Sequence, residues 1–126
     1  MSKILVADED AGALEGIAAA LESAGHEVTR ARNGGQAREA LTQETFALLV
    51  TDLEMPVLKV MDLLSLVRAQ PNPIPVIVVS ASGSREERRK ARAVGAAALV
   101  ERGAPHLIGL VREVERLTQQ VGGGHG

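Results

Sequence analysis

Acidic, hydroxyl and basic side chains directly follow apolar segments at several points of this 126-residue chain. In chain order they are Asp8, Glu9 and Asp10, then Asp52, Ser80 and Arg102. Carboxylates gathered in a small space repel one another unless a cation lies among them. Hard oxygen ligands suit Mg²⁺ and, by the same chemistry, Mn²⁺. If the apolar segments end at one place in the fold, these acids predict a divalent cation site.

Asp52 is the residue that such a site would turn into a phosphoryl acceptor. A carboxylate is a weak nucleophile, but phosphoryl transfer depends mainly on positioning and on charge neutralisation. A metal ion on one side, with Arg102 and the Ser80 hydroxyl on the other, would hold the phosphoryl oxygens. The same residue types therefore predict both a metal site and a phosphoacceptor.

Each of these residues also has a simpler structural interpretation. Asp10 is well placed to cap a helix, and Asp52 could be no more than a turn former. The Ser80 hydroxyl could simply satisfy loop backbone groups. Their joint placement after separate apolar segments favours the functional interpretation.

A predicted alternation of strands and helices positions these side chains. The segments that we interpret as strands lie at 4–7, 26–31, 46–51, 76–79 and 97–100. Helical spacing of apolar residues follows each of them, at about 14–24, 37–41, 58–69, 84–94 and 107–117. Ser84, with Glu87 three residues later, is a capping-box signal for the fourth helix. This alternation predicts an α/β fold: a parallel sheet with helices on both faces and its sites at the carboxyl ends of the strands.

Composition limits the remaining function classes. Hydrophobic residues at 45% and charged residues at 24% fit one globular domain, predicted at 1–121, followed by a disordered glycine-rich tail at 122–126. The net charge of −2 argues against direct nucleic-acid binding, and the lack of cysteine excludes disulfides and thiolate sites. No apolar run reaches the length of a membrane span, and the chain enters its first strand without a secretory leader. We expect a cytoplasmic protein that binds neither membrane nor nucleic acid.

Four motifs of this chain, taken in order, resemble those of the receiver domains of two-component response regulators. They are Ile-Leu-Val-Ala-Asp-Glu-Asp at 4–10, Thr-Asp-Leu-Glu-Met-Pro at 51–56, Val-Val-Ser-Ala at 78–81 and Val-Gly-Ala at 94–96. The resemblance covers nearly the whole chain and implies a flavodoxin-like, doubly wound (βα)5 fold with strand order 2-1-3-4-5. It implies a phosphoacceptor at Asp52 and a switch hydroxyl at Ser80. It also implies Mg²⁺ or Mn²⁺ ligands at Asp8, Glu9, Asp52 and the backbone carbonyl of Glu54.

The resemblance also implies partners. A sensor histidine kinase or a histidine phosphotransfer protein would donate the phosphoryl group. A downstream protein would bind the face formed by the fourth helix, fifth strand and fifth helix, and a homodimer is possible.

Four positions depart from the family pattern. Arg102-Gly103 stands where the family usually has lysine followed by proline, and an arginine is larger and forked, so it is not equivalent to lysine. Leu99 replaces the aromatic switch residue, Val60 replaces a loop glycine, and Glu9 replaces the more usual aspartate. These changes leave the metal and acceptor residues in place and alter the residues that would report phosphorylation.

Three other functions remain open beside the phosphoacceptor switch. A pseudo-receiver would keep the fold and act as a protein-interaction module without phosphorylation. A small phosphatase would need a general acid–base near Asp52, for which Glu54 has the right spacing, but 126 residues leave no room for a cap domain. A flavodoxin-like electron carrier is disfavoured because the chain has no Trp or Tyr to flank a flavin.

Basic residues crowd the predicted fourth helix at 84–94. They are Arg85, Arg88, Arg89, Lys90 and Arg92, interleaved with Glu86 and Glu87. A solvated helix face with intrahelical ion pairs is the favoured interpretation, and a docking face for a protein partner is the alternative.

Overall fold

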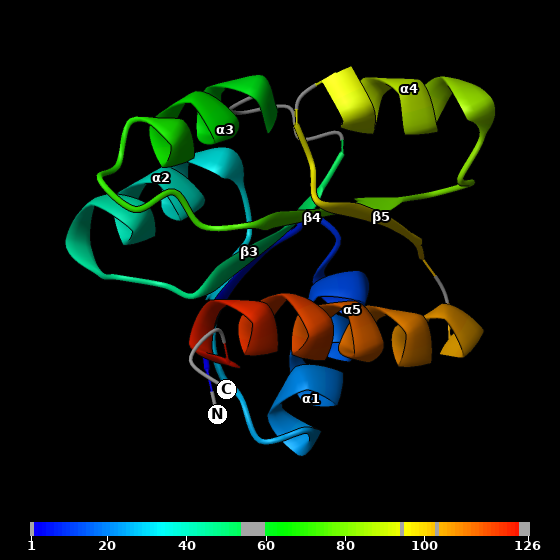
Figure 1. The fold of residues 1–126 in the computed structure, drawn as a ribbon. Coiled ribbons are helices and arrows are strands. Elements are labelled where there is room, and N and C mark those ends of the chain that lie inside the picture. Colours follow the sequence, from blue (N-terminus) through cyan, green and yellow to red (C-terminus); the bar gives the residue numbers. More distant parts are fainter. Residues whose placement is uncertain (1, 54–59, 94, 103, 124–126) are drawn as a thin grey trace.

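The computed structural model describes residues 2–53, 60–93, 95–102 and 104–123. Within them, strands and helices alternate along the chain as predicted (Figure 1). The strands are β1 (Lys3–Ala7), β2 (Glu27–Ala31), β3 (Leu48–Asp52), β4 (Val76–Ser80) and β5 (Ala98–Glu101). The helices are α1 (Ala11–Ser23), α2 (Gly34–Gln43), α3 (Val60–Arg68), α4 (Arg85–Ala93) and α5 (Ala104–Gly123). None of the helices in this described part combines the length and the apolar character that crossing a membrane requires.

The strands form one parallel sheet in the order β2-β1-β3-β4-β5, so the predicted fold and strand order are confirmed. The chain begins at β1, adds β2 on one side and then crosses to add β3 on the other. In doubly wound sheets, sites form at the carboxyl ends of the strands where the order reverses in this way. Ala7 of β1 is in register with Thr51 of β3, so the residues that follow them emerge side by side.

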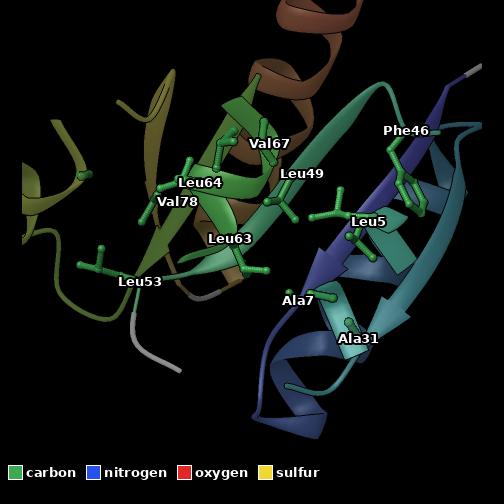
Figure 2. Packing of buried hydrophobic residues seen from close by; sticks show 14 residues of the cluster. Leu5, Ala7, Ala31, Phe46, Leu49, Leu53, Leu63, Leu64, Val67 and Val78 are labelled. Carbon is green, nitrogen blue, oxygen red and sulfur yellow. The ribbon is translucent and has the colours of Figure 1, made fainter. Parts of the chain in front are cut away.

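Successive side chains of each strand enter opposite layers of the core. Ile4 and Val6 belong to the cluster under α1 and α5, whereas Leu5 and Ala7 belong to the cluster under α2, α3 and α4. Figure 2 shows the cluster under α2, α3 and α4, in which strand side chains such as Leu5 and Leu49 join side chains of α3. Because helices cover both faces, the central strands are continuous apolar segments rather than alternating ones.

Several predicted boundaries differ from the structure, among them the start of β3 and the end of α5. β3 begins at Leu48 rather than at Phe46, because the buried Phe46 ring packs in the core from the segment before the strand. α5 continues to Gly123, so the first two residues of the predicted tail are helical and 124–126 lie outside the described residues. Within this helix the Thr118 hydroxyl donates to the Val114 carbonyl at 2.8 Å.

Leu49→Ala should lower the free energy of unfolding by about 3 kcal/mol, because Leu49 is 0% exposed at the centre of the sheet and its truncation leaves a cavity. Urea unfolding followed by far-UV circular dichroism measures this, since the chain has no tryptophan or tyrosine to follow by fluorescence. Ile108→Ala, at a side chain that is 64% exposed, should change stability by less than about 0.5 kcal/mol. Equal losses in the two variants would contradict the assigned core.

Candidate functional site

Two acidic side chains lie together at the carboxyl edge of the sheet. Asp8 follows β1 and is 1% exposed, and Asp52 ends the neighbouring strand β3 and is 9% exposed. The Asp8 backbone is tied to β2 by its N–H bond to the Ala31 carbonyl at 3.0 Å. Its Oδ1 accepts a hydrogen bond from the Asp10 N–H at 2.9 Å, which leaves Oδ2 directed toward the site. The fold therefore buries two carboxylates within one small region.

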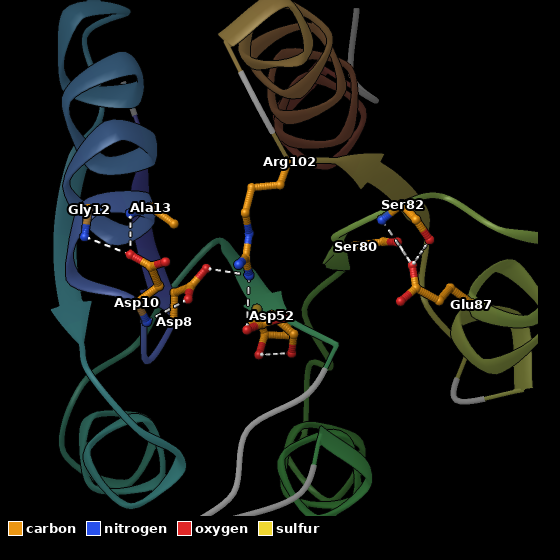
Figure 3. Close-up of polar contacts among 10 residues, drawn as sticks. Asp8, Asp10, Gly12, Ala13, Asp52, Ser80, Ser82, Glu87 and Arg102 are labelled. Carbon is orange, nitrogen blue, oxygen red and sulfur yellow. Dashed lines mark hydrogen bonds and ion pairs between the residues drawn. The ribbon is translucent and has the colours of Figure 1, made fainter.

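Arg102 lies between these two acids (Figure 3). Its Nη2 atom is 3.1 Å from Asp8 Oδ2 and 2.9 Å from Asp52 Oδ2. The backbone N–H of Arg102 bonds to the Ser80 carbonyl at 2.8 Å, which fixes the start of the side chain beside the end of β4. The guanidinium therefore reaches both acids.

The charges in this cluster shift one another's pKa. Burial raises the pKa of the Asp8 carboxyl; the Asp10 N–H and Arg102 work to lower it, and the Asp52 carboxylate works to raise it, so it stays above its ordinary value. For Arg102, burial works to lower the pKa, but Asp52 and Asp8 outweigh it and the pKa is raised. The guanidinium is thus firmly charged, and it is the positive partner that lets Asp8 and Asp52 lie side by side.

The guanidinium is not fully satisfied in this position. Its Nε atom is the only side-chain nitrogen or oxygen in the described part of the chain that is buried without a hydrogen-bond partner. An unpaired buried donor costs about 1–3 kcal/mol. Arg102 is therefore held at the site mainly by the contacts of Nη2 with the two acids.

The carboxylates of Asp8 and Asp52 have the donor chemistry that a divalent cation requires. Their Oδ2 atoms already converge on one positively charged atom, and two carboxylates with water completing the shell suit Mg²⁺. The third predicted acid, Glu9, is exposed, and Glu54 lies outside the described residues. Within the described ranges no three Asp, Glu, His or Cys side chains form a group able to hold a metal ion, so Glu9 stays a prediction.

Asp10 and Leu99 have structural roles, as a helix cap and as a packing residue. The Asp10 carboxylate caps α1 by accepting hydrogen bonds from the N–H groups of Gly12 and Ala13, as its simpler interpretation predicted. Leu99 is half-buried in β5 and packs against the cluster under α2, α3 and α4. Val60 begins α3, and Gly103 lies outside the described residues.

Ser80 has a partner that the sequence did not reveal. Its hydroxyl lies at the end of β4, is completely buried, and donates a short hydrogen bond to Glu87 Oε1 (Figure 3). The predicted capping box is half present: the Glu87 N–H bonds to Ser84 Oγ at 3.2 Å. The Glu87 carboxylate does not return to the Ser84 N–H but bonds to Ser80 and Ser82, because those buried and loop donors lie nearer to it. The only sequence signal for this contact was the cluster of serines before α4.

A family model of the response regulator receiver domain matches residues 4–105. This chain belongs to that family. Receiver domains serve two-component systems, and phosphorylation and Mg²⁺ binding are characteristic of them. The family membership agrees with the acid pair at the switch point of the sheet.

Curated relatives share the receiver segment of this chain. The transcriptional regulatory protein PrrA of Mycobacterium tuberculosis is 34% identical over 86 residues, covering 68% of this chain and 37% of PrrA. The gliding motility regulatory protein of Myxococcus xanthus is 32% identical over 120 residues, covering 92% of this chain and 15% of that protein. The receiver thus corresponds to well under half of each of these relatives.

Solved structures share its fold. The receiver domain of Francisella response regulator 1452 is 28% identical, with a TM-score of 0.84 over 96% of this chain and 99% of that one. The receiver domain of the sensor histidine kinase PA1611 from Pseudomonas aeruginosa is 24% identical, with a TM-score of 0.82 over 93% of this chain and 97% of that one. That structure is described with a magnesium ion coordinated in its active-site cleft.

Asp8→Asn should stabilise the receiver at pH 7 in metal-free buffer, because it removes a buried negative charge and keeps an oxygen for the Asp10 N–H. The pKa of Asp8 is higher in the folded protein than in the unfolded chain. The protonated carboxyl therefore stabilises the fold at a pH below the unfolded-state pKa. This stabilisation is lost as the pH rises through the folded-state pKa. The stability gained by Asp8→Asn should therefore be largest near neutral pH and shrink as the pH falls toward 4.

Urea unfolding at several pH values measures this difference, with the exposed Asp62→Asn as the matched control. A gain that is absent at pH 7, or that grows on acidification, would show that Asp8 is adequately compensated by Arg102.

Proposed function

We propose that this receiver is a phosphoacceptor switch in which Asp52 accepts a phosphoryl group from a phosphohistidine donor. The observation that carries the proposal is the pairing of the Asp52 carboxylate with Arg102, beside Asp8, at the point where the strand order reverses. In the transfer, the bond between phosphorus and the donor nitrogen breaks, and a bond between phosphorus and an Asp52 oxygen forms. A sensor histidine kinase or a histidine phosphotransfer protein would supply the group.

Asp8 and Asp52 would hold Mg²⁺, with Glu9 and the Glu54 carbonyl as the remaining proposed ligands. When bound, the ion supplies positive charge that offsets the acids and the incoming phosphoryl oxygens. Arg102 would leave the acid pair and pair with a phosphoryl oxygen, for which a guanidinium is well suited. The Ser80 hydroxyl would donate a hydrogen bond to another phosphoryl oxygen.

The response would be read at the surface formed by α4, β5 and α5. Phosphorylation of Asp52 at the end of β3 would act on Ser80 at the end of β4, beside the loop that leads into α4, and β5 pairs directly with β4. A downstream protein that recognises this surface would then distinguish the two states.

A phosphorylation-independent interaction module is the second candidate. One observation favours it: Arg102 places positive charge between Asp8 and Asp52, so the acid pair has a counter-charge without a metal ion or phosphate. The two candidates differ in whether Asp52 can be modified at all.

Incubation with Mg²⁺ and acetyl phosphate should add one phosphoryl group to the parent chain and none to Asp52→Asn. Intact-mass spectrometry measures the addition, with a receiver of known activity treated in parallel. A folded parent that gains no phosphoryl group while the control receiver does would refute the acceptor role and favour the interaction module.

Arg102→Gln should tighten Mg²⁺ binding at least about tenfold, because it removes the positive charge that competes for the oxygens of Asp8 and Asp52. Isothermal titration calorimetry measures the affinity without reference to phosphorylation. Arg102→Lys, which keeps the charge, should bind Mg²⁺ more weakly than Arg102→Gln.

Arg116→Gln serves as the matched control, because Arg116 lies on α5 and pairs with Glu113 rather than with the site. If it tightened Mg²⁺ binding as much as Arg102→Gln, the effect would come from net charge and not from competition within the acid pair.

A further inference from the structure

The Ser80 hydroxyl can serve only one acceptor at a time. A serine hydroxyl has one hydrogen to donate, and in this structure that hydrogen goes to Glu87 Oε1. The oxygen of the same hydroxyl accepts a hydrogen bond from the Gly83 N–H at 2.8 Å. Figure 3 shows Ser80 directed toward Glu87, while Asp52 faces Arg102. A phosphoryl oxygen on Asp52 must therefore compete with Glu87 for this hydrogen.

We propose that Glu87 is a positioning residue for Ser80, holding its hydroxyl toward α4 until phosphorylation of Asp52 draws the hydroxyl away. The inference rests on the proposed function, in which Ser80 contacts the phosphoryl group, and it assigns control of that contact to a residue of α4. Glu87 itself touches neither Asp52 nor the phosphoryl group.

The surroundings of Glu87 make this exchange feasible. Its Oε1 also accepts hydrogen bonds from Ser82, from the N–H at 3.2 Å and from the hydroxyl at 3.0 Å. When Ser80 leaves, these two donors still bind the carboxylate, so no charge is left unpartnered. The bond to Ser80 is the largest of the contacts that hold the pKa of Glu87 below its ordinary value, so the acceptor is charged at neutral pH.

The contact also connects the site to α4 mechanically. Glu87 lies in the first turn of α4, where its N–H is capped by Ser84. Arg88, next in the helix, donates from Nε to the Gly83 carbonyl at 2.8 Å. Release of Ser80 therefore changes the bonding of the short loop before α4 and of the first helical turn. This route to the α4 surface does not need an aromatic ring at position 99, where the chain has a leucine.

The test measures the rate at which acetyl phosphate and Mg²⁺ add a phosphoryl group to the full chain, followed by intact mass. Glu87→Ala removes the competing acceptor and should react about tenfold faster than the parent, as expected for the loss of one hydrogen bond to a charged group. Glu87→Gln keeps a neutral acceptor and should react at an intermediate rate. Glu86→Gln, at the exposed neighbour that pairs with Lys90, should react like the parent.

A double-mutant cycle separates positioning from general effects on the fold. In a Ser80→Ala background, Glu87→Ala should leave the phosphorylation rate unchanged, because no hydroxyl remains to be held. A rate increase that persists without Ser80 would overturn the inference, since Glu87 would then act by another route.

The remaining outcomes distinguish this inference from the proposed function. If the parent is phosphorylated and Glu87→Ala reacts at the same rate, the positioning role fails and the acceptor role stands. If Glu87→Ala is phosphorylated and the parent is not, the positioning role is supported, because the contact between Glu87 and Ser80 would then prevent the reaction. If no variant is phosphorylated, the proposed function fails and the positioning role falls with it.

Discussion

The structure of the site depends on one electrostatic requirement: two carboxylates buried at adjacent strand ends need positive charge between them. Asp8 and Asp52 are placed there by the pairing of β1 with β3, and neither can move away without breaking the sheet. Arg102 meets the requirement from the end of β5, with one nitrogen within 3.1 Å of both. Because burial strengthens such interactions, the pair and its counter-charge behave as one unit.

The Ser80 hydroxyl, like the acid pair, is bound by another side chain of the same protein. Ser80 is buried at the end of β4, and a buried hydroxyl needs a hydrogen-bond partner. Glu87 supplies it, just as Arg102 supplies charge to the acids. In the described structure, each group that would contact a phosphoryl oxygen is therefore already occupied by a residue of the same chain. Phosphorylation of Asp52 would exchange these internal bonds for bonds to the phosphoryl group.

This arrangement shows how the domain provides partners for its acid pair while departing from the family pattern. An arginine after β5 reaches both acids, with its Nη2 atom within 3.1 Å of each. Leu99, which stands where the family has an aromatic ring, is half-buried and packs against the core. The hydrogen bond from Ser80 to Glu87 links the end of β4 to α4 instead.

The sequence by itself determined the order of strands and helices, the α/β class and the strand ends at which Asp8, Asp52 and Ser80 stand. These features follow from local periodicity and from apolar segments, which are properties of neighbouring residues. The ends of the strands could not be predicted to the residue. A buried side chain such as Phe46 gives the same apolar pattern inside a strand and just before it.

Only the tertiary structure decided which side chains bond to one another. Arg102 and Asp8 are 94 positions apart, and their contact depends on the lengths and directions of side chains from three strand ends. Glu87 fitted the capping-box pattern equally well, and only the nearby Ser80 and Ser82 donors turned its carboxylate toward the site. Periodicity places backbones, but the choice among competing polar partners is made by distances that exist only in the folded chain.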